Sequence, residues 1–206
     1  MKVILIIFAA VILVGIGRYA LNLQTLDVAN EGSNEAQVSR TTDEFAHDCS
    51  GIPVRELAEG PYYKAGSPNT ADIYSTDIPG EKLMLEGYVL DTNCRPISGA
   101  WLDFWQTDGN GNYDNNGFSL RGHQFTDESG KYSLTTVVPG EYPGRTAHIH
   151  FKVKASENAP IITSQLFFPD ARSNQSDAIF DQLLIVTTND TDSGKVAQYN
   201  IVLEGK

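Results

Sequence analysis

The chain has 206 residues, of which 41% are hydrophobic and 10% aromatic, a composition typical of a globular protein with a buried core. Its formal net charge of −11 argues against nucleic acid and an anionic membrane surface as partners, because both would repel an acidic protein. The composition therefore favours a small-molecule substrate, and we expect no nucleic-acid partner.

Residues 1–21 predict an export signal or an N-terminal membrane anchor. Between Lys2 and Arg18 the chain reads VILIIFAAVILVGIG, without a charge. A run of this length is typical of a signal-peptide core and short for a bilayer span. The residues leave open whether the segment is cleaved or stays as an anchor. We expect the protein to be exported, either secreted or anchored on the extracytoplasmic side of the membrane.

The rest of the chain divides into a linker and a folded domain. Residues 22–48 are polar and aperiodic, which predicts a flexible linker, and the domain is expected over residues 49–206. Cys49 and Cys94 are the only cysteines. In an oxidising compartment such a pair predicts a disulfide, whereas a cytosolic protein would carry two free thiols.

A β pattern begins at residue 83. Short β-branched or aromatic runs occupy residues 83–90, 100–105, 131–137, 147–154, 163–168, 182–188 and 198–205. Turn signals such as DTNCRPISG, TDGNGN and TDESGK separate them, and only SDAIFDQLL has a weak helical period. This pattern predicts an all-β fold, an antiparallel β-sandwich.

Residues 147–154, AHIHFKVK, carry two histidines on one face of a predicted strand. Side chains alternate along a strand, so Ile149 and Phe151 share the core face, while His148 and His150 point away from it, toward water or a lined cleft. Two imidazoles at this spacing can bind one metal ion. A solvated polar face explains them equally well, and the strand leaves both interpretations open.

Two tyrosines could complete a metal site. Tyr142 lies six residues before His148, and Tyr113 lies in the loop TDGNGNYD. Since the phenol pKa is about 10, a tyrosine ligand requires an acidic metal ion such as Fe(3+). The alternative is ordinary packing, because the chain has nine tyrosines. Asp108 and Asp114 in the same loop imitate a calcium loop, which lacks its required glycine and glutamate here.

The longer motifs resemble one enzyme family. The runs GAWLDFWQTDGNGNY, LRGHQFTDESGKYSLTTVVPGEYPGRTAHIHFKV and TSQLFF are similar to the intradiol ring-cleavage dioxygenases, the family of protocatechuate 3,4-dioxygenase and catechol 1,2-dioxygenase. The resemblance covers roughly residues 52–205 and implies a β-sandwich. It further implies a non-haem Fe(3+) enzyme that cleaves a small aromatic diol with O₂ between its hydroxylated carbons, giving cis,cis-muconate-type diacids.

The resemblance also assigns roles by position. It implies four iron ligands: Tyr113, Tyr142, His148 and His150. Tyr142 would leave the iron when substrate arrives, and so take part in catalysis. Arg145 would lie beside the substrate and steady developing negative charge, and Gln165 would belong to the same pocket. Tyr62, in EGPYY, matches a loop that packs near the pocket.

The chain departs from the family at one point that bears on the identity of the substrate but not on the type of reaction. Only Pro143 and Gly144 stand between Tyr142 and Arg145, where familiar members carry a long insertion, so the substrate's identity is not inherited. The resemblance is to small, exported, single-domain members. An alternative is a prealbumin-like β-sandwich module that binds without catalysis, which two segments also resemble: GYVLDTNCRPISGAWLDFW and TDESGKYSLTTVVPGEY. That alternative leaves the two histidines, Arg145 and Gln165 unexplained.

Overall fold

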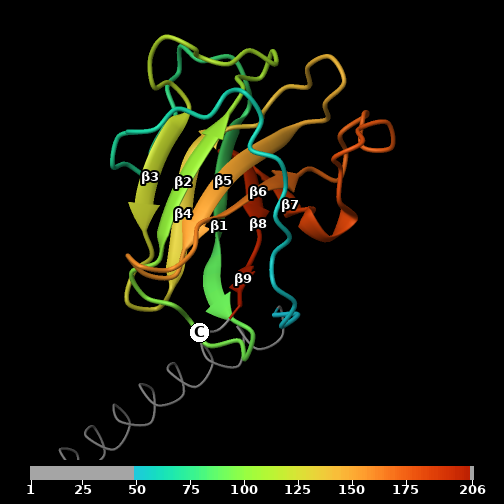
Figure 1. Ribbon diagram of the computed structural model, residues 1–206. Coiled ribbons are helices and arrows are strands. Elements are labelled where there is room, and N and C mark those ends of the chain that lie inside the picture. Colours follow the sequence, from blue (N-terminus) through green and yellow to red (C-terminus); the bar gives the residue numbers. More distant parts are fainter. Residues whose placement is uncertain (1–48, 205–206) are drawn as a thin grey trace, which may run out of the picture. The chain divides into compact units, whose positions relative to one another are not determined.

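The computed structural model describes residues 49–204 (Figure 1). Its elements are β1 (Lys82–Asp91), β2 (Trp101–Gln106), β3 (Arg121–Phe125), β4 (Lys131–Val137), β5 (His148–Lys154), β6 (Ile162–Phe167), the 3-10 helix η1 (Gln182–Leu184), β7 (Thr187–Thr191), β8 (Gly194–Gln198) and β9 (Ile201–Leu203). The predicted export segment 1–21 and linker 22–48 lie outside the described residues and stay predictions. Within residues 49–204, no helix is long and apolar enough to cross a membrane.

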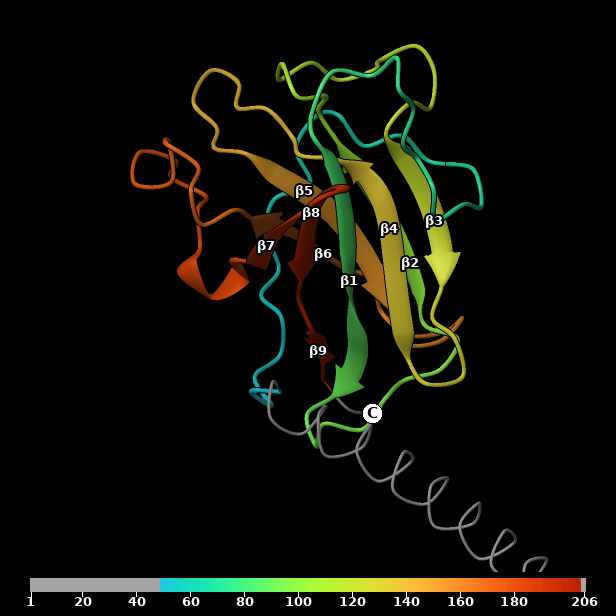
Figure 2. The ribbon, with the colours of Figure 1, turned by 180° about the vertical axis from the view of Figure 1, so that it is seen from behind.

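The strands form two sheets. One has the order β3-β2-β5-β6, and the other has the order β4-β1-β8-β7, with β9 also paired to β1. The first sheet lies in front in Figure 1, and the second lies in front in Figure 2, which views the molecule from the opposite side. The predicted all-β sandwich is therefore confirmed. The second sheet is mixed, however, because β8 and β9 run parallel to β1 as consecutive pieces of one chain segment.

The interruption between β8 and β9 explains a glycine in β1. The carbonyl of Tyr199 lies so close to Gly87 that an added Cβ there would sit 1.8 Å from its oxygen. The side-chain oxygen of Asn200 instead accepts a hydrogen bond from Tyr88 N at 3.0 Å. The break therefore keeps the β1 backbone hydrogen-bonded while the chain shifts from β8 to β9.

The core lies between the sheets and follows the alternation of the strands. Leu83 and Leu85 on β1 are fully buried, and Phe104 on β2 packs against Phe151 on β5 with ring centroids 6.4 Å apart. Tyr132 on β4 closes the layer, 5.8 Å from Phe104. Burying large aromatic side chains supplies much of the free energy that holds two sheets together.

Four parts of the strand prediction differ from the structure. Of the strand predicted over residues 198–205, the first residue ends β8 and only Ile201–Leu203 form β9. The strand predicted over residues 182–188 is wrong except at its last two residues, which begin β7. η1 forms over its first three residues, and Asp181 Oδ1 accepts a hydrogen bond from Leu183 N at 3.0 Å.

The strands β3 and β8 are absent from the prediction. Their segments, RGHQF and GKVAQ, lack apolar alternation. In β3 the core side carries Gly122 and Gln124 instead of large apolar residues.

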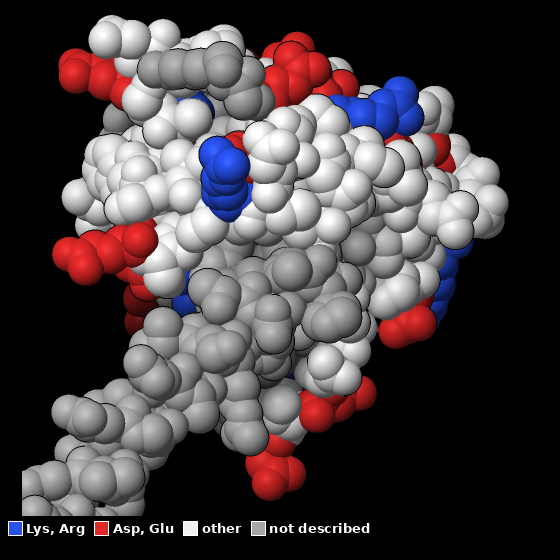
Figure 3. All heavy atoms as spheres, turned by 90° about the horizontal axis from the view of Figure 1, so that it is seen from below, with Lys and Arg blue, Asp and Glu red and all other residues white. Residues whose placement is uncertain are grey.

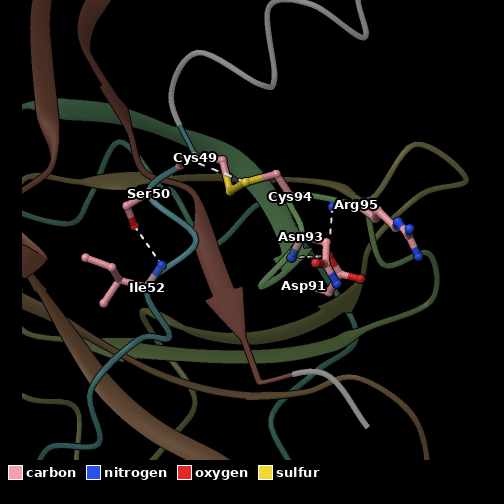
Figure 4. Close-up of a disulfide and its surroundings, with 7 residues drawn as sticks. All are labelled: Cys49, Ser50, Ile52, Asp91, Asn93, Cys94 and Arg95. Atoms are coloured by element: carbon pink, nitrogen blue, oxygen red, sulfur yellow. Dashed lines mark hydrogen bonds between the residues drawn. A yellow bond between two sulfur atoms is a disulfide. The ribbon is translucent and has the colours of Figure 1, made fainter.

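The predicted disulfide between Cys49 and Cys94 is confirmed, with Cα atoms 5.9 Å apart (Figure 4). It ties the first described residue to the turn that follows β1. Asp91 Oδ1 holds this turn by accepting hydrogen bonds from the backbone of Asn93 at 2.8 Å and of Arg95 at 2.9 Å. In the chain-entropy model, closing a loop of this size stabilises the fold by about 4 kcal/mol.

Residues 55–70, here called the strap, cross the outer face of the sheet β3-β2-β5-β6, in teal in Figure 1. At one end Leu57 N donates to Thr163 O on β6 at 2.9 Å, and at the other Thr70 N donates to His123 O on β3 at 2.9 Å. The strap covers the face of β5 that was expected to meet water or a cleft. Almost the whole of β5 is consequently buried on both faces.

Charged side chains are scattered over the face seen in Figure 3, with acidic and basic groups interspersed. They do not gather there into a patch of one sign. Among the described residues visible in this view, no charged patch marks a binding region.

Candidate metal centre

The four side chains that the resemblance assigns to iron converge on one cluster, in which the histidines are buried and the tyrosines half-buried. His148 and His150 project from the strap side of β5, Tyr142 lies just before that strand, and Tyr113 comes from the loop after β2. Ring centroids are 4.7 Å apart for the histidines and 5.9 Å for the tyrosines. Tyr142 lies 5.7 Å from His148, and Tyr113 lies 6.5 Å from His150. The four rings therefore neighbour one another.

The two histidines face each other through their ε nitrogens. Nδ1 of His148 lies 2.6 Å from the Thr146 carbonyl oxygen, to which it donates, so the lone pair stays on Nε2. That Nε2 is 3.1 Å from Nε2 of His150. Burial lowers the pKa of His148 to about 4 and that of His150 well below its usual value, and the charge of Arg145 acts in the same direction. Both rings are therefore neutral at pH 7, the form that binds metal ions.

The cluster holds polar atoms without partners. Tyr113 Oη and His150 Nδ1 are buried and form no hydrogen bond. Buried polar atoms are nearly always partnered, so two in one cluster require an explanation. Burial raises the pKa of Tyr113 above its usual value, and the neighbouring Tyr142 adds to the effect. Tyr113 therefore keeps its proton until a strong Lewis acid displaces it, and a metal ion would give Oη its missing partner.

The donor set decides which metal would fit. Within residues 49–204, no group of three or more His, Cys, Asp or Glu side chains could hold a metal ion. A metal at this cluster would thus need tyrosine oxygens beside the imidazole nitrogens. Phenolates are hard anionic donors and suit a hard trivalent ion. The residues present therefore fit Fe(3+).

The strap forms the roof of the cluster. The ring of Tyr62 stacks on Tyr113, with centroids 4.2 Å apart and planes 18° apart, and meets Tyr142 edge-on at 6.2 Å. Gly60 lies against His150, where an added Cβ would sit 3.8 Å from Cε1. The prediction that the EGPYY loop packs near the pocket is therefore confirmed. Of the two interpretations that the strand left open for the histidines, the solvated polar face is wrong, because both side chains are buried.

Arg145 and Gln165 lie together at the edge of the cluster. Arg145 Nη1 is 3.4 Å from Tyr142 Oη, and Nη2 donates to Gln165 Oε1. Gln165 stands directly across from His150 in the pairing of β5 with β6, and its Nε2 donates to Ala58 O in the strap at 2.9 Å. The guanidinium consequently reaches both a candidate ligand and the strap-bound amide.

Asp177 is a residue of this site that sequence reasoning missed. Its Oδ2 accepts from Arg145 Nε and from Thr146 N, both at 2.9 Å, and its side chain is almost fully buried. Burial alone would raise the pKa of Asp177, but hydrogen bonds from Ile179, Thr146 and Arg145 outweigh it and hold the pKa below its usual value. Asp177 is 32 residues from Arg145, and only tertiary contact identifies it.

Other polar candidates lie outside the cluster. His123 Nδ1 contacts the Ser67 carbonyl at 2.8 Å, toward the far end of the strap. The carboxylates of the calcium-like loop cap their own turns: Asp108 Oδ1 accepts from Asn112 N at 2.9 Å, and Asp114 Oδ1 accepts from Gly117 N at 2.7 Å. The loop that imitates a calcium site thus uses its carboxylates to shape the segment that carries Tyr113.

Known proteins share this arrangement of strands. The dioxygenase domain of a dioxygenase carbohydrate-binding protein fusion from Streptomyces sp. SirexAA-E is similar, with a TM-score of 0.73 and 41% identity, over 75% of this chain and 100% of that domain. An intradiol ring-cleavage dioxygenase from Tetranychus urticae matches with a TM-score of 0.68 and 25% identity, over 74% of this chain and 95% of that one.

Sequence comparison agrees with the structures. Hydroxyquinol 1,2-dioxygenase from Rhizobium sp. (strain MTP-10005) is 32% identical over 170 residues, which are 69% of this chain and 57% of that relative. The chain thus spans little more than half the length of this relative. A family model described as Dioxygenase matches residues 58–205, which include all six residues assigned to the site. The chain therefore belongs to the intradiol ring-cleavage dioxygenase family.

Proposed function

We propose that this protein is an Fe(3+)-dependent dioxygenase that cleaves a catechol-type ring between its two hydroxylated carbons. Both atoms of O₂ enter the product, a cis,cis-muconate-type diacid. The observation that carries the proposal is the cluster of two buried imidazoles with facing Nε2 atoms and two half-buried tyrosines in a chain of this family. A bound ferric ion would act as a Lewis acid that binds both oxygens of the diol and makes its ring reactive toward O₂.

Tyr113, Tyr142, His148 and His150 would hold this ion. The tyrosines differ in what surrounds their hydroxyls. Arg145 Nη1 lies 3.4 Å from Tyr142 Oη, whereas Tyr113 Oη has no hydrogen-bond partner. Tyr142 can therefore leave a metal and still be hydrogen-bonded, and its Oη can accept a proton from the diol. Tyr113, which has no such alternative, would remain a ligand throughout.

Arg145 would stabilise the negative charge that develops on the ring of the substrate. Its side chain is only 14% exposed and is held by Asp177 and Gln165, so the charge is positioned before reaction. A fixed charge in a site with little water stabilises a developing anion far more than a solvated one does. The strap supports this role by covering His150 and Tyr113 from the outside.

The test is iron content, visible absorption and product analysis of the full-length protein. We expect stoichiometric iron, a charge-transfer band from tyrosinate to iron, and ring-opened product from a panel of catechols. With ¹⁸O₂ both labelled atoms should appear in the diacid. Protein that stays colourless after ferric reconstitution and opens no catechol would contradict the proposal and favour a binding module without catalysis.

We also propose that the protein acts outside the cytoplasm, with residues 1–21 as signal or anchor and residues 22–48 as linker. The disulfide between Cys49 and Cys94 supports this location, because such bonds persist in oxidising compartments. Fractionation of the source cells tests the proposal: a protein recovered with reduced cysteines from the cytoplasm would contradict it.

A further inference from the structure

Arg121, the first residue of β3, is a buried cation that the proposed chemistry leaves unused. Its exposure is only 2%, and within residues 49–204 no carboxylate lies within 4.0 Å of its guanidinium. A buried charge without a counter-ion is costly and is kept only where its hydrogen bonds or its function compensate. Arg121 therefore requires an explanation other than an ion pair.

The contacts of Arg121 join two segments that are distant in sequence. Nη1 donates to the carbonyl of Tyr62 in the strap at 2.7 Å. Nη2 donates to the carbonyl of Asp114, the residue after Tyr113, at 3.1 Å. The guanidinium carbon also lies 5.9 Å from the centre of the Tyr113 ring. One side chain thus holds the backbone on both sides of the stacked pair Tyr62–Tyr113.

We propose that Arg121 is the positioning residue of the Tyr113 ligand, fixing the strap and the loop after β2 so that the Tyr113 hydroxyl is aimed at His150 and Tyr142. The inference rests on the proposed ferric site, and it assigns Arg121 no contact with metal or substrate. Tyr113 Oη has no hydrogen bond of its own to fix its direction. Its direction is therefore set by the stacking ring of Tyr62 and by the loop that Arg121 holds.

The geometry requires an arginine. A planar guanidinium can donate to two carbonyls on different segments while presenting a charged face to an aromatic ring. A lysine ammonium has the same charge but is a single point on a flexible stem, and cannot span both carbonyls in this way. Arg121→Lys therefore keeps the charge and removes the bridge, which separates positioning from simple electrostatics.

The first experiment compares Arg121→Lys and Arg121→Gln with wild type as purified ferric proteins. Iron affinity is measured by chelator competition, and the tyrosinate-to-iron band is recorded. We expect both variants to hold iron about 10- to 100-fold more weakly, as is usual when an outer-shell partner of a ligand is lost. The absorption maximum should shift in the variants, and on a Tyr113→Phe background Arg121→Lys should cause no further shift.

The matched control is Ser67→Ala. Ser67 Oγ donates to Asp103 Oδ1 at 2.7 Å and is another buried anchor of the strap, away from Tyr113. This variant should keep the wild-type band and affinity. If Ser67→Ala reproduces the Arg121 variants, or if Arg121→Lys keeps the wild-type band and affinity, positioning of Tyr113 by Arg121 is wrong.

A metal-free measurement keeps the inference testable if iron binding is lost altogether. Stacking on Tyr62 should shift the proton resonances of the Tyr113 ring upfield in metal-free protein, and Arg121→Lys should remove this shift while circular dichroism stays that of a β-sandwich. An unchanged Tyr113 spectrum would overturn the inference on its own. Wild type that never forms a tyrosinate band would instead overturn the proposed function, and the ligand role of Tyr113 with it.

Discussion

The two faces of β5 are both buried, yet they use burial in different ways. Toward the core, Ile149 and Phe151 meet other apolar side chains and need no specific partner. Toward the strap, His148 and His150 are equally buried but must satisfy polar atoms, and His150 Nδ1 has no partner. The buried apolar side chains of this strand therefore stabilise the fold, whereas the buried histidines, one of which has a ring nitrogen without a hydrogen-bond partner, mark the candidate metal site.

His150→Ala tests the strap face and should have the largest effect. Removing a metal ligand should abolish iron retention and lower turnover beyond the roughly 10- to 100-fold loss expected for an outer-shell partner. The metal-free protein should also lose stability, because the buried His150 ring stacks on Trp105 with centroids 4.7 Å apart and contacts His148 Nε2 at 3.1 Å, so iron content is compared in the folded fraction. His123→Ala, on β3, which β2 separates from β5, is the control and should keep iron. Iron-replete, active His150→Ala would remove this residue from the metal site.

Phe151→Ala tests the core face of the same strand. The side chain is fully buried between Phe104 and the core, so its removal should leave a cavity and lower the free energy of unfolding by about 3 to 5 kcal/mol. Urea denaturation of the metal-free protein measures this. Phe151→Leu should cost less, and iron content of the folded fraction should stay near wild type. Loss of iron without loss of stability would reverse the assignment of the two faces.

Tyr142→Phe removes one hydroxyl from the strap face. If Tyr142 Oη accepts a substrate proton, turnover should fall by about 100-fold or more, the usual range for a lost acid-base group, while the other three ligands keep iron bound. Steady-state kinetics with iron quantification in the same sample checks this. Unchanged turnover would refute the role assigned to Tyr142.

Asp177→Asn tests how the charge of Arg145 is held. Loss of the ionic partner should lower kcat/KM by about 10-fold with iron content unchanged, because Arg145 loses its fixed orientation. Asp181→Asn is the matched control, since it breaks the pair with Arg55, whose side chain is 63% exposed. Equal kinetic effects of the two substitutions would exclude a specific role for Asp177.

The smallest effect concerns the opposite sheet, where Glu86 pairs with Lys131 at 2.9 Å. Hydrogen bonds from Lys131 and then Gln198 hold the pKa of Glu86 below its usual value. Its folded pKa is thus below the unfolded value of about 4.3, so its contribution is present above that pH and lost as the pH falls through the folded pKa. Because the pair is partly exposed, Glu86→Gln should cost at most about 1 kcal/mol at pH 7 and less at pH 3. Unfolding at both pH values measures the difference.

Sequence patterns predict most strands where apolar residues alternate. The strand predicted over residues 131–137 has the observed bounds of β4, and the one over 83–90 differs from β1 by one residue at each end. β3 escapes prediction because its core side carries Gly122 and Gln124, which have no apolar signature. The start of segment 182–188 resembles a strand in composition, but local capping by Asp181 outweighs its apolar residues.

The candidate site divides in the same way. Four residues have side chains that can bind a metal, and the resemblance to the family joins them into one predicted site: Tyr113, Tyr142, His148 and His150. Arg121 and Asp177 give no such signal, because a buried arginine bridging two carbonyls and an aspartate holding a distant arginine have no local pattern.

Alternation and side-chain chemistry are properties of short stretches of sequence, so the sequence alone was enough to predict the β-sandwich, and the presence of only two cysteines was enough to predict the disulfide. The residues alone left the metal site open, and only the resemblance to the family joined four of them into one ligand set. The burial of the histidines required the tertiary structure, since the strap that covers them lies more than 75 residues away in the chain. The tertiary structure also determined which polar atoms lack partners and which charged side chains hold the site, because desolvation and hydrogen bonding depend on segments that meet only in the folded protein.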